Sequence, residues 1–95
     1  MDLSTVIAGA SFPFGVMNAS GALCVTRKEL EALGGSQAGA IVTKSMTPLA
    51  REGNPQPRYV AFEGGSINSM GLPNLGYHAY AKLIPELKRF GKPVI

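Results

Sequence analysis

The order of apolar and polar positions predicts short strands separated by loops. Residues 5–7, 12–14 and 16–17 alternate with turn residues, so we expect a β-hairpin followed by a core strand. Residues 38–42 form a continuous run of small and β-branched residues, which is typical of a buried parallel strand. Another apolar strand begins at residues 92–95, where the chain stops, and this is typical of an interrupted domain.

Two helices are expected between these strands. Thr26 and Glu29 have the spacing of a capping box, and the pair of glycines at 34–35 should end that helix. A second helix should follow Asn74 as its cap, and Pro85 should kink it or split it in two. The order of strand, helix and strand predicts an α/β fold built from βα units.

A long loop lies between the expected strand at residues 38–42 and the second expected helix. Residues 46–60 contain three prolines, so we expect an ordered, stiff segment of the kind that often has a functional role. The peptide bonds at 54–55 and 56–57 are candidates for the cis form because both precede proline. The alternative is a plain connector.

Composition narrows the class of protein. The chain has 95 residues, of which 45% are hydrophobic and 16% charged, as in one small globular domain or part of a larger one. Its net charge of +3 comes from scattered basic residues without interleaved aromatic ones, which argues against a nucleic-acid interface. One cysteine permits no internal disulfide, and no apolar run is long enough to span a membrane. We therefore expect a cytoplasmic protein.

Lys44 is the first candidate for chemistry. It directly follows the expected buried strand, and polar residues at the carboxyl ends of barrel strands form active sites. A buried ammonium group needs an anionic or electron-rich partner. The alternative is a lysine that extends its side chain to solvent.

Residues 64–74 and 18–21 are the second and third candidates. Both are rich in small residues that let a ligand approach the backbone closely, and the Asn68 amide could bind a planar ring. Residues 64–74 could equally form a turn between a hairpin and a helix. Cys24 is expected to be a small buried thiol, and His78 a surface residue without metal-ligand partners, so we expect no metal site.

Three segments in this order resemble a known family. The matching residues are Asn18-Ala19-Ser20-Gly21, Val42-Thr43-Lys44-Ser45 with residues 51–59, and Gly65-Ser66-Ile67-Asn68-Ser69-Met70-Gly71-Leu72-Pro73-Asn74-Leu75-Gly76. Together they are similar to the dihydroorotate dehydrogenases, and the last segment resembles the soluble, fumarate-using class. The resemblance covers nearly all of residues 12–95 with matching spacing.

The resemblance implies a (β/α)8 barrel with bound FMN, of which residues 1–95 would be the N-terminal hairpin and the first βα units of a single domain. It implies oxidation of dihydroorotate to orotate in pyrimidine synthesis, with fumarate as electron acceptor and a cytoplasmic homodimer. Arg51 and Arg58 would shape the site. The residues implied at the flavin are Ala19, Ser20, Lys44 and Ser45; those implied at the substrate are Lys44, Asn68, Met70, Gly71 and Leu72.

The family draws its catalytic base, a cysteine in this class, from a later part of the chain. Cys24 does not match that motif, so no catalytic base is expected among these residues. A fragment that binds no flavin by itself, and the related flavin domain of dihydropyrimidine dehydrogenases, are the alternatives.

Overall fold

The computed structural model describes residues 1–95 and begins with the expected hairpin. Strand β1 (Thr5–Ile7) pairs antiparallel with β2 (Ala10–Phe12). The two residues between them, Ala8 and Gly9, both have positive φ, as tight hairpin turns require. β2 lies at residues 10–12 instead of the expected 12–14, and it ends before Pro13, which has no N–H to donate.

No strand follows at residues 16–17, so that prediction was wrong. Val16 is 62% exposed. Its carbonyl accepts one bond from the Gly39 N–H at 2.8 Å, which holds the segment beside residue 39 without a ladder.

The first helix, α1 (Arg27–Gly35), has the expected start. The Thr26 hydroxyl accepts from the Glu29 N–H, and the Glu29 carboxylate accepts from the Thr26 N–H at 2.9 Å. This reciprocal pair satisfies two backbone donors that a helix start would otherwise leave free. Leu30, on the inner side of α1, is fully buried.

A second hairpin and a second helix follow the long loop. Strands β3 (Tyr59–Phe62) and β4 (Gly65–Asn68) pair antiparallel, and α2 (Tyr77–Leu87) leads into a 3-10 turn, η1 (Lys88–Phe90). Of the two outcomes expected at Pro85, a split of the helix is wrong, because α2 runs through this residue without a break. Pro85 and Ala81, whose carbonyl loses its partner, are both exposed, so water can replace that bond. Neither helix is long and apolar enough to cross a membrane.

Asn74 does not cap α2. The residue preceding the helix is Gly76, with φ of +85°, and no side chain caps it. The Asn74 amide instead links two segments: its Oδ1 accepts from the Thr47 N–H at 3.1 Å and from the Gly76 N–H at 2.9 Å.

The expected buried strand at 38–42 is reduced to one parallel bridge between Ile41 and Val94. Three backbone bonds support it: Ile41 N–H to Pro93 O at 2.9 Å, Thr43 N–H to Ile95 O at 2.7 Å, and Ile95 N–H to Ile41 O at 2.9 Å. The parallel direction is as predicted, but the opposite edge meets a loop, so no longer ladder forms.

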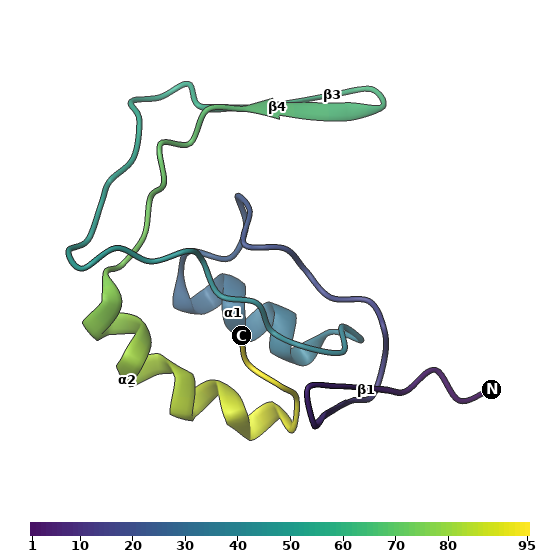
Figure 1. Cartoon of the computed structure of the whole chain (residues 1–95). Coiled ribbons are helices and arrows are strands. Elements are labelled where there is room, and N and C mark those ends of the chain that lie inside the picture. The colour runs from purple at the N-terminus through teal and green to yellow at the C-terminus, as the bar shows by residue number, and fades with distance from the viewer.

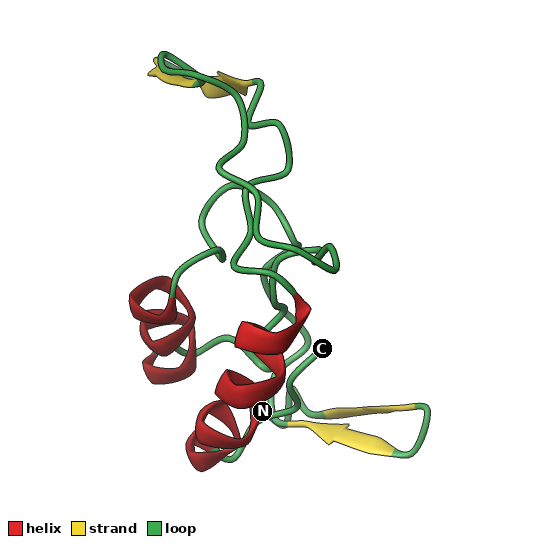
Figure 2. Ribbon diagram, turned by 90° about the vertical axis from the view of Figure 1, so that its left-hand side faces the viewer, coloured by secondary structure: helices red, strands yellow, loops and turns green.

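One small core lies between the helices and this bridge. Figure 1 shows α1 and α2 below the β3–β4 hairpin, with the C-terminus between the helices. In Figure 2 the two hairpins lie at opposite ends of the molecule. The fold is therefore a small α/β arrangement without a closed barrel. The core residues are Cys24, Leu30, Ile41, Tyr80, Leu83 and Leu87.

Candidate functional site

Lys44 lies just beyond the Ile41–Val94 bridge and is buried, with 7% of its surface exposed. Its Nζ donates to the carbonyl oxygens of Ser20 at 3.0 Å and Gly21 at 2.7 Å. The alternative of a lysine extended into solvent is therefore wrong. An ammonium group has three N–H bonds, so one donor is left for a further partner.

The loop at residues 19–21 is held from several sides. The Cys24 thiol points at the carbonyls of Ala19 and Gly21, at 3.7 and 3.6 Å. The Ser45 hydroxyl donates to the Ser20 hydroxyl at 3.2 Å. The four residues expected at the flavin, Ala19, Ser20, Lys44 and Ser45, are thus brought together, although 24 positions separate Ser20 from Lys44.

A pocket of about 470 Å³ joins this loop to the second hairpin. Ala19 and Gly21 line it from the loop, and Tyr59, Ser66 and Asn68 line it from β3 and β4. Asn68 is paired with Tyr59 across the hairpin, and its side chain is exposed. The structure therefore brings one expected substrate residue, Asn68, to the same pocket as the expected flavin residue Ala19.

The other expected substrate residues lie against the long loop. The Met70 carbonyl accepts from the Asn54 N–H at 2.8 Å. Gly71 has φ of +76°, and a Cβ there would lie 2.4 Å from the Asn54 Oδ1, so this close approach requires glycine. Leu72 also has positive φ, and its carbonyl accepts from the Asn74 amide at 3.0 Å. None of the three lines the 470 Å³ pocket.

The long loop is ordered by backbone contacts, as expected. Arg51 pairs with Asn74 through two backbone bonds of 2.9 and 3.0 Å, while its side chain is exposed. Arg58 donates to the Glu52 and Asn54 carbonyls, so it braces the loop from within. The peptide bond before Pro57 is cis, and that before Pro55 is not.

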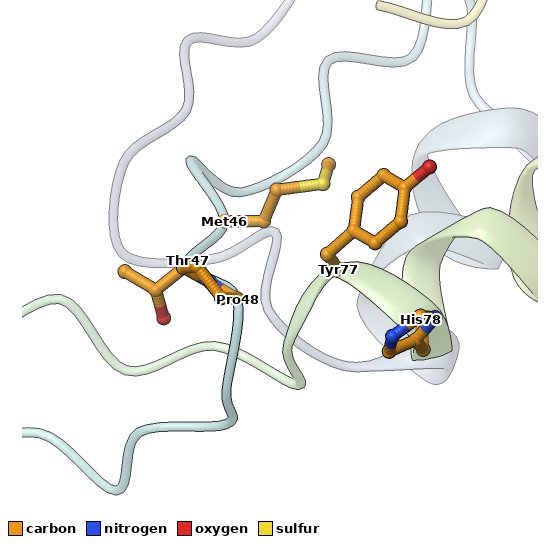
Figure 3. Close-up of a pocket in the computed structure, with 5 residues that line it drawn as sticks. All are labelled: Met46, Thr47, Pro48, Tyr77 and His78. Carbon is orange, nitrogen blue, oxygen red and sulfur yellow. The ribbon is translucent and has the colours of Figure 1, made fainter.

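A second pocket, of about 290 Å³, lies where α2 begins (Figure 3). Met46 extends towards the Tyr77 ring, with Thr47 and Pro48 completing that side. His78 is exposed, as expected, and its ring meets Tyr77 edge-on at 5.2 Å. No group of three or more His, Cys, Asp or Glu side chains could hold a metal ion.

Cys24 is the small buried thiol that the sequence predicts, with 1% of its surface exposed. Burial raises the pKa of this thiol above the usual 9.0, and the Lys44 charge opposes the rise. Burial likewise raises the pKa of Tyr80, whose hydroxyl donates to the Val25 carbonyl at 2.8 Å.

These shifts predict a loss of stability at alkaline pH. The folded protein holds both protons more tightly than the unfolded chain, so their contribution is complete below the unfolded pKa values and disappears as pH rises through the folded ones. We expect the unfolding temperature, followed by circular dichroism, to fall above about pH 9. Cys24→Ser keeps a donor but does not titrate there, so its unfolding temperature should fall less. If the unfolding temperatures of the wild-type and Cys24→Ser proteins fell equally with rising pH, the contribution assigned to the Cys24 thiol would be contradicted.

Two residues of the site were given no contact or role of their own from the sequence, although Asn18 belongs to the third candidate segment. Asn18 bonds to the backbone of Val42 with its side chain, and Tyr59 lines the 470 Å³ pocket. The signal for Asn18 is an amide directly after an apolar segment, since an amide can satisfy both polar groups of a strand edge. Tyr59 had no signal beyond its place at the end of the proline-rich loop.

Comparison with known proteins identifies one family. The family model described as dihydroorotate dehydrogenase matches residues 2–93. A dihydroorotate dehydrogenase A (fumarate) of Lactococcus lactis subsp. lactis is 60% identical over 78 residues, which are 82% of this chain and 25% of that protein. A dihydroorotate dehydrogenase (fumarate) of Trypanosoma cruzi is 53% identical over 76 residues, which are 80% of this chain and 24% of that protein.

A Streptococcus agalactiae protein is 53% identical over 88 residues, which are 93% of this chain and 28% of that protein. The chain thus spans about a quarter of the length of the curated relatives it matches. Because the family model covers almost every residue, the chain belongs to the dihydroorotate dehydrogenase family.

Proposed function

We propose that this chain is the N-terminal portion of a cytoplasmic, FMN-dependent dihydroorotate dehydrogenase that oxidises dihydroorotate to orotate and passes the electrons to fumarate. The family supports the reaction, and the printed names of the Lactococcus and Trypanosoma relatives support fumarate. In this proposal residues 1–95 contribute the first part of one (β/α)8 barrel, and the complete enzyme is a homodimer. The catalytic base comes from sequence that this chain does not contain.

The buried Lys44 ammonium carries the proposal. It sits at the end of a strand segment, is fixed by two carbonyl oxygens, and retains one N–H donor. A fixed cation with a free donor stabilises negative charge on a bound ligand, because the donor needs no reorientation when the charge develops. Lys44 would thus bind the substrate carboxylate and offset negative charge on the reduced flavin.

The residues around Lys44 fit a flat ring. Ala19 and Gly21 have little or no side chain, and both line the pocket beside the loop, so a planar group can approach their backbone. FMN, when bound, supplies the acceptor for the hydride that leaves dihydroorotate. Ala19, Ser20, Lys44 and Ser45 would hold its ring through backbone groups and hydroxyls.

The substrate would bind beside Asn68. An amide can donate to and accept from the amide edges of a pyrimidine ring, and Asn68 faces the pocket that Ala19 lines. Met70, Gly71 and Leu72 would contribute backbone groups. Met70 and Gly71 pack against Asn54, and the Leu72 carbonyl accepts from the Asn74 amide, so these contacts fix the backbone before any ligand arrives.

The test is flavin content and turnover of the protein as it is synthesised, with any sequence that accompanies these residues. We expect a yellow protein whose FMN is released on denaturation and which oxidises dihydroorotate with fumarate as acceptor. A colourless protein that also fails to quench the fluorescence of added FMN would contradict the proposal. Lys82→Ala, an exposed change on α2, is the matched control and should leave both properties unchanged.

A further inference from the structure

The backbone of residues 41–44 faces two different partners in alternation. Ile41 and Thr43 bond to residues 93–95 on one edge. Val42 and Lys44 turn their polar groups to the other edge, where the segment from Asn18 to Cys24 passes. This alternation is that of a strand with two neighbours, although only the first neighbour is itself extended alongside it.

On the second edge a side chain takes the place of a strand. The Asn18 Oδ1 accepts from the Val42 N–H at 2.9 Å, and its Nδ2 donates to the Val42 carbonyl at 2.7 Å. Nδ2 also donates to the Ala19 carbonyl at 3.1 Å. Asn18 thus gives Val42 the donor and the acceptor that the peptide groups of a neighbouring strand would supply, and both of its amide hydrogens are used.

A second anchor lies two residues further along. The Lys44 N–H donates to the Cys24 carbonyl at 3.2 Å. The loop between the anchors, residues 19–23, is therefore fixed at both ends to the segment that carries Lys44. Its Ser20 and Gly21 carbonyls are the oxygens on which the Lys44 ammonium rests.

We propose that Asn18 is a positioning residue, which holds the Ser20 and Gly21 carbonyls against the Lys44 ammonium by substituting for a strand at Val42. One part of this proposal rests on the proposed function. If Lys44 binds an anionic ligand, Asn18 determines where the ammonium group lies relative to that ligand. Asn18 also lines the 470 Å³ pocket, but both of its amide hydrogens and its Oδ1 are already bonded within the chain. In this proposal it acts through the loop, so its loss should free Lys44.

The test is the rate at which acetic anhydride modifies Lys44 in the purified protein, measured by peptide mass spectrometry. A buried ammonium with two acceptors should react slowly, with the exposed Lys28 and Lys82 as internal references in the same sample. In Asn18→Ala we expect Lys44 to react about tenfold faster relative to those references, since three bonds that close the loop are gone. Asn18→Asp keeps the acceptor for Val42 but loses both donors, and should also accelerate the reaction.

Asn74→Ala is the matched control. Asn74 is a buried amide with bonds to the Thr47 and Gly76 backbone, whereas Asn18 is half-buried, and none of the hydrogen bonds of Asn74 reaches the 18–24 segment. Its loss should lower the unfolding temperature while Lys44 stays slow. If Asn18→Ala fails to fold, Asn18→Asp decides the matter.

Three outcomes would overturn the inference. They are a wild-type Lys44 as reactive as Lys82, a folded Asn18 variant whose Lys44 stays slow, and an equal acceleration in Asn74→Ala. The proposed function fails separately, if the wild-type protein binds no FMN, and that result leaves the labelling rates as they are.

Discussion

Replacement of Lys44 by methionine is expected to lower the rate of dihydroorotate oxidation by about 10²–10³-fold, as the loss of one preorganised donor does elsewhere. Methionine has similar length and stays compatible with burial, but it carries no charge and no donor. The Ser20 and Gly21 carbonyls would lose their shared charged partner, and a hydrogen bond to a charged group contributes about 1.5–3 kcal/mol. Water can offset part of this loss, because Ser20 is half-buried and Gly21 is exposed. Turnover and free energy of unfolding should therefore both fall.

Two further variants separate these effects. Lys44→Arg keeps the charge, but its planar fork cannot reproduce the geometry of an ammonium on two adjacent carbonyls, so we expect partial activity. Lys82→Met removes an exposed lysine from α2 and should change neither quantity. Wild-type turnover in a folded Lys44→Met protein would remove Lys44 from the mechanism.

Gly39→Ala is expected to destabilise the fold by about 1–3 kcal/mol or more, the cost of overpacking a site that cannot yield easily. A Cβ at Gly39 would lie 1.7 Å from the carbonyl oxygen of Phe14. The obstacle is backbone rather than a flexible side chain, so the segment after β2 would have to move. The bond from the Gly39 N–H to Val16 would be lost with that movement.

Gly35→Ala provides the comparison. Gly35 ends α1, and a Cβ there meets nothing within 4 Å. Alanine should be neutral or stabilise the helix by up to about 1 kcal/mol. Urea unfolding of the two variants checks the pair, and similar midpoints for both would show that residues 14–16 adapt freely.

Local signals in the sequence were sufficient for several elements. The capping box at Thr26, the N-terminal hairpin and the buried thiol of Cys24 depend on neighbours within a few positions, and all are present, although the second strand of the hairpin lies two residues earlier than expected. The cis bond at Gln56–Pro57 was one of two named candidates, and no local signal separated it from Asn54–Pro55.

Two of the failures share a physical cause, since each depends on a distant partner. Asn74 has the composition of a helix cap, but its amide is engaged by Thr47, 27 positions away. Residues 38–42 have the pattern of a buried strand, yet a loop occupies one of their edges. The hydrophobic pattern of a segment shows how apolar the segment is, but it does not show which other segments lie beside it.

For the candidate site too, local signals predicted one part, and the contacts with distant residues could not be predicted. The position of Lys44 after an apolar run predicted a strand-end cation, and the structure buries it there. The sequence could not show that its partners are the Ser20 and Gly21 carbonyls, because backbone oxygens have no sequence signature. The role of Asn18 stayed hidden for the same reason.

The parallel bond between Thr43 and Ile95 joins residues 52 positions apart. On a ribosome that adds about 5–20 residues per second, the apolar segment at 38–42 exists for roughly 3–10 seconds before its partner is synthesised. During that interval only earlier residues can cover it, and the bonds from Gly39 to Val16 and from Val42 to Asn18 are of that kind. The loop that fixes Lys44 would then also cover this apolar segment during translation, before residues 93–95 are synthesised.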